Sequence, residues 1–125
     1  MKRTLQVLVL LPAILFLVTG LRWLVMPEGV APTLGMSLAE GIALSSQVGD
    51  LSAFFLTLGL CMLLALVTER RLWYYPAIML LSLAALGRVL AWLLHDATFA
   101  IELIAPEIVI AVILVVASRR LPTTD

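Results

Sequence analysis

The sequence predicts an all-α polytopic membrane protein, a four-helix transmembrane bundle with both termini in the cytoplasm. Two observations predict this class. About 63% of the 125 residues are hydrophobic and only 13% are charged, which is far more apolar than an average soluble domain. In addition, the chain contains four apolar segments of the length that a bilayer-spanning helix needs, about 20 residues. The length corresponds to one domain.

The first predicted span covers residues 5–26 and follows Lys2 and Arg3. A basic start before an apolar run also occurs in signal peptides, but no small-residue cleavage site follows, so we expect a retained helix. Residues 27–49 are rich in glycine, proline and serine and are predicted to form an extracytoplasmic loop. Within it, residues 36–44 are predicted as a short interfacial helix or, alternatively, as a lid over the mouth of the bundle.

The second predicted span covers residues 50–68. Asp50 stands at the expected N-cap, where a carboxylate also suits the helix dipole. Steps of three and four place mostly small or weakly polar residues on one face, which a membrane helix turns toward its neighbours. The residues of this face are Asp50, Phe54, Thr57, Cys61, Ala65 and Thr68. Cys61 is interpreted as a small packing residue.

The third and fourth predicted spans cover residues 72–95 and 98–118. The third opens with aromatic residues typical of a membrane interface, and it carries Arg88 well inside. Gly87, beside Arg88, is predicted to let another backbone approach closely. The fourth contains Pro106, where we expect a kink in one continuous helix, because a helix starting at Pro106 is too short to span.

Basic residues predict the orientation of the bundle. Three clusters fall on one side of a four-span topology, namely Lys2 with Arg3, Arg70 with Arg71, and Arg119 with Arg120. By the positive-inside rule that side is cytoplasmic. The opposite half of the membrane then receives ionisable residues from three spans, Asp50, Arg88, His95, Asp96, Glu102 and Glu107. We therefore predict a polar pocket in the outer half of the bundle.

Arg88 is predicted to be the electrostatic centre of this pocket. A cation near the centre of a span costs roughly 2.5–3.5 kcal/mol on insertion scales, so it needs an anionic partner. We predict Glu107 and Asp50 as its counter-ions. The predicted rim consists of His95, Asp96 and Glu102. Trp92, one turn from Arg88, is predicted to pack or to cap the face of the guanidinium.

The third and fourth spans carry the motifs G-R-V-L-A-W-L-L-H-D and P-E-I-V-I-A. These motifs resemble an uncharacterised bacterial family of four-helix membrane proteins known only as a domain of unknown function. The matching residues are Gly87, Arg88, Asp96 and Glu107, while Ala97 stands where that family usually has glycine. The resemblance implies a four-helix fold and the polar cluster. It implies no chemistry, because the family has no established activity.

The predicted function is a non-catalytic module of the bacterial inner membrane. It would bind membrane lipid or another amphiphile, dock to a partner membrane protein, or form a homo-oligomer. A purely structural ion pair that sets helix register is an alternative. Others are a membrane enzyme acting on a lipid-dissolved substrate, with a carboxylate or His95 as acid–base, and a proton-relay subunit of a transporter.

Several classes of site lack their sequence signatures. The chain has a single histidine and no zinc-binding, nucleophile-elbow or phosphate-loop motif, so no metal and no cofactor is predicted. Its formal net charge is zero, which gives no reason to predict a nucleic acid partner.

Overall fold

The computed structural model describes residues 2–125 of the chain as an all-α protein. Its long helices are α1 (Lys2–Val25), α3 (Gly41–Thr68), α4 (Tyr74–Leu94) and α5 (Ile101–Arg120), and its short helical turns are α2 (Pro27–Val30), η1 (Ala31–Leu34) and η2 (Arg71–Trp73). Four helices, with η2 continuing into α4, are long and apolar enough to cross a membrane, with mean hydropathies of 2.1 to 2.4. The predicted all-α fold with four long apolar helices is confirmed.

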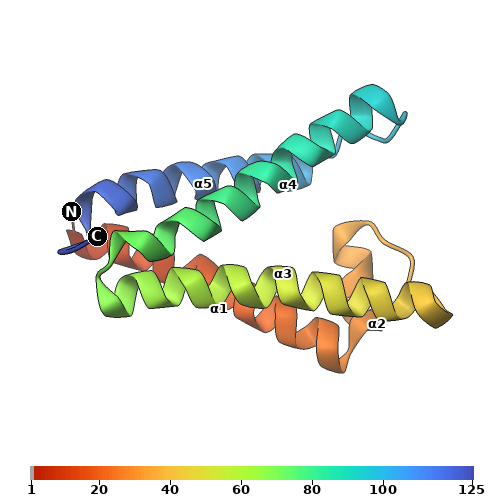
Figure 1. The fold of residues 1–125 in the computed structure, drawn as a ribbon. Coiled ribbons are helices and arrows are strands. Elements are labelled where there is room, and N and C mark those ends of the chain that lie inside the picture. The colour runs from red at the N-terminus through yellow and green to blue at the C-terminus, as the bar shows by residue number, and fades with distance from the viewer. Residues whose placement is uncertain (1) are drawn as a thin grey trace.

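The four long helices form two antiparallel pairs, α1 with α3 and α4 with α5 (Figure 1). The pairs meet at the end that carries both chain termini and the α3–α4 turn, and they diverge toward the opposite end (Figure 1). The three basic clusters therefore lie at the same end of the molecule. We call this the basic end and the other the splayed end.

The main core lies toward the basic end, where the two pairs meet. Each long helix contributes at least one side chain that is completely buried there, including Val9, Leu58, Leu81 and Leu114. On α4 the buried positions recur at steps of three and four and stop at Ala85, so no residue of this helix after Ala85 is buried. The loss of burial along α4 thus agrees with the divergence of the two helix pairs toward the splayed end.

The α1–α3 interface depends on glycines that let the two helices approach closely. A Cβ atom at Gly59 would lie 2.9 Å from the backbone oxygen of Ala13 and 2.7 Å from Cγ of Leu17. This close contact turns the Gly59 side of α3 inward, together with Phe55 and Met62. The predicted interface of α3 was therefore only partly right. Of its six residues only Cys61 and Ala65 are buried, while Phe54 is half-buried and Asp50, Thr57 and Thr68 are exposed.

Helix α3 begins at Gly41, well before the predicted start at Asp50. The prediction was wrong because it treated Ser45, Ser46 and Gly49 as loop residues, whereas the structure places them in the first turns of a long helix. Its N-cap is Glu40, which makes no side-chain capping bond. Gln47 instead holds the preceding segment, accepting a hydrogen bond from the Ala39 amide at 2.9 Å.

The connection between α1 and α3 is shorter than predicted and largely structured. Residues 27–34 form α2 and η1, and no separate helix covers residues 36–44. Val30 and Ala31 are buried against Trp23 and Phe55, which makes a second apolar cluster over the splayed end of the α1–α3 pair. Arg22 donates a hydrogen bond to the Gly29 carbonyl oxygen at 3.0 Å. The connection thus packs on α1 and α3.

Helix α4 ends in a left-handed turn. Asp96 has φ +57°, a conformation that aspartate tolerates better than most residues. The amide of Ala97 then donates back to the Ala91 carbonyl oxygen at 3.2 Å, as in a Schellman-type cap. Helix α5 begins at Ile101 and continues through Pro106 to Arg120, so the prediction of one helix containing this proline agrees with the structure.

The C-terminal tail is anchored at the basic end. The amide of Thr123 donates to the Glu69 carbonyl oxygen, and the amide of Arg71 donates to that of Thr124, both at 2.9 Å. The Arg71 side chain adds Nε–H to the Ser118 carbonyl oxygen at 2.7 Å and an ion pair to Asp125. These bonds join the α3–α4 turn to the end of α5.

Candidate functional site

The structure pairs Arg88 of α4 with Glu107 of α5. Nε of Arg88 donates to Oε1 of Glu107 at 3.0 Å. The arginine side chain is 30% exposed and the glutamate side chain 13% exposed, so the pair is partly covered by the protein. Both residues lie inside helices that are long enough to span a membrane.

The pair continues the inward-facing stripe of each helix. On α4 the buried positions Tyr74, Ala77, Leu81 and Ala85 are followed, at the same steps of three and four, by Arg88. On α5 Glu107 lies one turn from buried Ile104. The ion pair therefore faces the same way as the core, and Arg88 lies one turn beyond Ala85, the last buried residue of α4.

The guanidinium of Arg88 is only partly engaged. Among residues 2–125, its only hydrogen bond is the one from Nε–H to Glu107, and neither Nη atom has a partner. An arginine carries several N–H donors in a fixed planar fork and no acceptor. The pair is thus balanced in charge, while the Nη donors of Arg88 have no protein partner among residues 2–125.

The structure does not gather the other predicted site residues around Arg88. Asp50 is exposed on α3, in the helix pair that diverges from α4 and α5, and it forms no ion pair with any residue from 2 to 125. His95 and Asp96 are exposed in the α4–α5 connection, and Glu102 is exposed in the first turn of α5. The predicted six-residue pocket is therefore reduced to one pair, because the pocket required α3 to stay beside α4 as far as the splayed end.

Trp92 lies at the rim without covering the guanidinium. It is 45% exposed, and its ring packs against Phe99 with centroids 4.8 Å apart and an interplanar angle of 61°. This edge-on contact joins the end of α4 to the connection that precedes α5. Of the two predicted roles for Trp92, the structure supports packing.

Small residues next to Arg88 leave an open surface on α4. A Cβ atom at Gly87 would meet no atom of residues 2–125 outside its immediate neighbourhood within 4 Å. The expected close approach of another backbone is therefore not made by this chain's own helices. Ala91, four residues later, is half-buried and belongs to the same face. The sequence interpretation missed this Gly-x-x-x-Ala spacing, although it is readable from the sequence.

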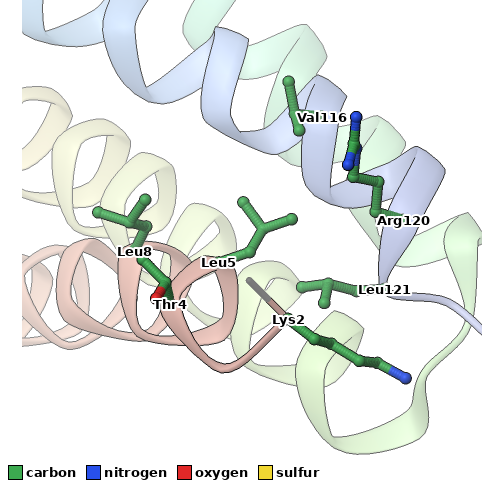
Figure 2. Close-up of a pocket in the computed structure, with 7 residues that line it drawn as sticks. All are labelled: Lys2, Thr4, Leu5, Leu8, Val116, Arg120 and Leu121. Carbon is green, nitrogen blue, oxygen red and sulfur yellow. The ribbon is translucent and has the colours of Figure 1, made fainter.

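A hollow with basic residues on its rim lies between α1 and α5 at the basic end. Its volume is about 530 Å³, and Leu5, Leu8 and Val116 form much of its apolar wall. Figure 2 shows Arg120 of α5 with its guanidinium beside Val116, and Lys2 of α1 with its ammonium group extending outward. This hollow lies at the opposite end of the bundle from Arg88 and is separate from the ion pair.

The described residues offer little for covalent or metal chemistry. No three His, Cys, Asp or Glu side chains among residues 2–125 come together in a way that would hold a metal ion. The two buried serine hydroxyls donate to backbone carbonyls, Ser52 to Gly49 at 3.2 Å and Ser118 to Val115 at 2.7 Å. Neither is hydrogen-bonded to a general base.

The fold and the site together define the class of protein. The chain is a small helical bundle whose four long apolar helices have the character of a multi-pass membrane protein. Comparisons with protein-family models, curated proteins and solved structures gave no match. The proposals below therefore rest on the molecule itself.

Proposed function

We propose that this protein is a non-catalytic docking module of the bacterial inner membrane, which binds a transmembrane helix through the splayed end of its α4–α5 pair. The observation that carries the proposal is the Arg88–Glu107 pair. It faces inward on both helices, and the two Nη atoms of Arg88 have no partner among residues 2–125.

The free-energy cost of an ionisable group in a membrane indicates that the face of α4 and α5 around Arg88 lacks a covering partner. Charged side chains within spanning helices almost always face protein or a water-filled cavity. Here the α1–α3 pair diverges (Figure 1) and leaves the Arg88 side chain 30% exposed. A further helix on this face, offering a carboxylate, hydroxyl or carbonyl oxygen, would satisfy the Nη donors and remove them from lipid.

The backbone next to Arg88 suits a helix as the occupant. Membrane helices associate through small residues that let their backbones approach closely. Gly87 and Ala91 present such a surface, and the space above Gly87 is open. A lipid chain gains little from a glycine, because it can pack on any apolar face. The pair of small residues therefore favours a protein partner over an amphiphile.

A second copy of the chain is the simplest partner with the required chemistry. In a two-fold symmetric contact, residue i meets j and residue j meets i. Two Arg88–Glu107 pairs related in this way would give the unengaged Nη atoms of each copy to the carboxylate of the other. The pair is thus complementary to itself, and no other acidic residue of the chain is needed.

The orientation belongs to the same proposal. The basic clusters lie at one end of the molecule (Figure 1), and the positive-inside rule assigns that end to the cytoplasm. The docking face then lies in the outer half of the membrane. The assignment to a bacterial membrane is part of the proposal, as an expectation from the four matching residues Gly87, Arg88, Asp96 and Glu107.

The test is site-specific crosslinking in living cells. A photoreactive side chain at Ala91 is expected to give a discrete protein adduct, with twice the chain mass for a second copy or another mass for a different partner. Arg88→Gln should abolish this adduct. Arg22→Gln is the matched control, because Arg22 is an exposed cation toward the same end that binds only the Gly29 carbonyl oxygen of its own chain.

A second pair of variants keeps the test independent of charge. Gly87→Leu fills the open surface and should abolish the adduct, whereas Gly49→Leu adds the same bulk at a site on α3 where nothing lies within 4 Å. The proposal fails if only lipid is crosslinked at Ala91, which would indicate amphiphile binding instead. It also fails if the adduct survives Arg88→Gln and Gly87→Leu.

A further inference from the structure

A long groove runs along α4 and α5 from the basic end. Two hollows of about 520 Å³ each lie on these helices, and both are lined by Ile78 and Val115. The two hollows meet at these two residues, and we call them together the α4–α5 groove. Neither Arg88 nor Glu107 lines it, so it is separate from the proposed docking surface.

The outer part of the α4–α5 groove is almost entirely apolar. Its walls are Leu81, Ala85, Leu86 and Val89 from α4 and Ile108, Ala111, Val112 and Val116 from α5, and Ser82 is the single polar residue. From Ile78 to Val89 the groove follows α4 for about 16 Å at 1.5 Å per residue. One leaflet's share of the hydrocarbon core is about 15 Å, so the apolar wall is long enough for an extended acyl chain that enters from the basic end.

The basic end of the same groove carries charged and aromatic residues. Arg71, Tyr75 and Arg119 line it beside Ser118. Arg71 is held in place, since its Nε–H donates to the Ser118 carbonyl oxygen at 2.7 Å. Nη1 of Arg71 donates to Oδ1 of Asp125. Nη2 of Arg71 and the whole guanidinium of Arg119 have no hydrogen-bond partner among residues 2–125.

We propose that the α4–α5 groove is a binding site for one anionic glycerophospholipid. The phosphate would lie between the unengaged Nη2 of Arg71 and the guanidinium of Arg119, whose planar fork suits phosphate oxygens. Tyr75 would lie at the level of the head group, as interfacial tyrosines do. One acyl chain would follow the apolar walls past Ser82. Basic pockets between helices at the cytoplasmic side of membrane proteins bind lipid head groups of this kind.

The combination of charge and length singles out this groove as the lipid site. The hollow between α1 and α5 also has two cations, Lys2 and Arg120, but its apolar wall is confined to Leu5, Leu8, Val116 and Leu121 near the basic end. It therefore lacks a track for a chain. An anionic head group is favoured over a zwitterionic one, because the attached choline of the latter would bring a cation toward Arg119, which has no carboxylate partner among residues 2–125, whereas Arg71 is already paired with Asp125.

Native mass spectrometry of the purified protein in detergent micelles tests the site. Dipalmitoyl phosphatidylglycerol and dipalmitoyl phosphatidylcholine are titrated separately, so that only the head group differs. We expect one tightly bound phosphatidylglycerol and weaker binding of phosphatidylcholine. Arg119→Gln should weaken phosphatidylglycerol binding about fivefold, the effect expected for one arginine near an anionic lipid surface. Arg3→Gln, an exposed cation at the same end that lines none of these hollows, should leave it unchanged.

A second matched pair tests the chain track. Ser82→Trp fills the groove and should abolish tight binding, whereas Leu83→Trp changes a neighbour that is 61% exposed and lies outside the groove. Both positions are exposed, so both variants should fold. Equal binding of the two lipids overturns the proposal. Equal effects of Arg119→Gln and Arg3→Gln, or of the two tryptophan variants, overturn it as well.

Discussion

Replacement of Gly59 by alanine is expected to destabilise the α1–α3 pair. The added Cβ atom would lie 2.7 Å from Cγ of Leu17 and 2.9 Å from the backbone oxygen of Ala13, whereas carbon atoms in contact prefer about 3.5–4.0 Å. The Leu17 side chain can rotate away. The Ala13 oxygen belongs to the backbone of α1, so relief of this second clash requires the whole helix to move.

The magnitude follows from two opposing effects. Overpacking of a close interface typically costs about 1–3 kcal/mol, and alanine is preferred over glycine inside a helix by up to about 1 kcal/mol. Gly59→Ala should therefore lower the free energy of unfolding by roughly 0–2 kcal/mol relative to the parent protein, and by about 1–3 kcal/mol relative to an alanine variant at an open helical glycine. Gly49→Ala is the matched control, because it lies in the same helix and its Cβ would meet nothing within 4 Å, so only the helix preference acts.

The assay is reversible unfolding in mixed micelles, with sodium dodecyl sulfate added stepwise and helix content followed by circular dichroism. Gly20→Ala is expected to fall between the other two variants, since its closest clash at 2.7 Å is with the flexible Leu56 side chain and its contact with the Leu56 amide is looser, at 3.0 Å. If Gly59→Ala is as stable as Gly49→Ala, then close packing at Gly59 does not hold α1 against α3.

Two further predictions concern the ion pair and the topology. Glu107→Gln should destabilise the protein by about 1–3 kcal/mol in the same assay, because it removes a charge-assisted hydrogen bond to Arg88 in a largely covered position. As a control, Glu102→Gln at an exposed position should change the free energy of unfolding by less than about 0.5 kcal/mol. Similar losses of stability in both variants would contradict the prediction. For the topology, Cys61 is replaced by alanine and a single cysteine is introduced at Arg3 or at Ser37. The two cysteines should react with a membrane-impermeant maleimide from opposite faces of sealed vesicles. Reaction of both from the same face would refute the four-span topology.

The candidate site shows how far helical periodicity reaches and where it stops. Arg88 and Glu107 could be paired from the sequence, because each is the inward-facing ionisable residue of adjacent antiparallel helices. Asp50 could not be excluded from the pair. Its exclusion depends on the start of α3 at Gly41 and on the divergence of the two helix pairs, and local residue patterns encode neither.

The interior of the α1–α3 pair shows the same limit. The sequence identifies α3 as an apolar helix, and it marks Cys61 and Ala65 as small residues suited to packing. It does not reveal that Gly59, which lies on another face, fits against the Ala13 carbonyl and so rotates α3. Which of several apolar faces is buried depends on the shape of the neighbouring helix, because all faces of such a helix are compatible with lipid.

By itself, the sequence determined the class of this protein. Its hydropathy and segment lengths indicate four membrane-length helices, because helices satisfy the backbone hydrogen bonds in an apolar solvent. Its basic clusters predict which end of the bundle faces the cytoplasm. Only the tertiary structure decided which charged residues form ion pairs, how the C-terminal tail is bonded to the α3–α4 turn, and where the two helix pairs diverge. These features depend on contacts between segments far apart in the chain, such as Arg71 with Ser118 and Arg88 with Glu107. Such contacts form only when the helices take one particular rotation and splay.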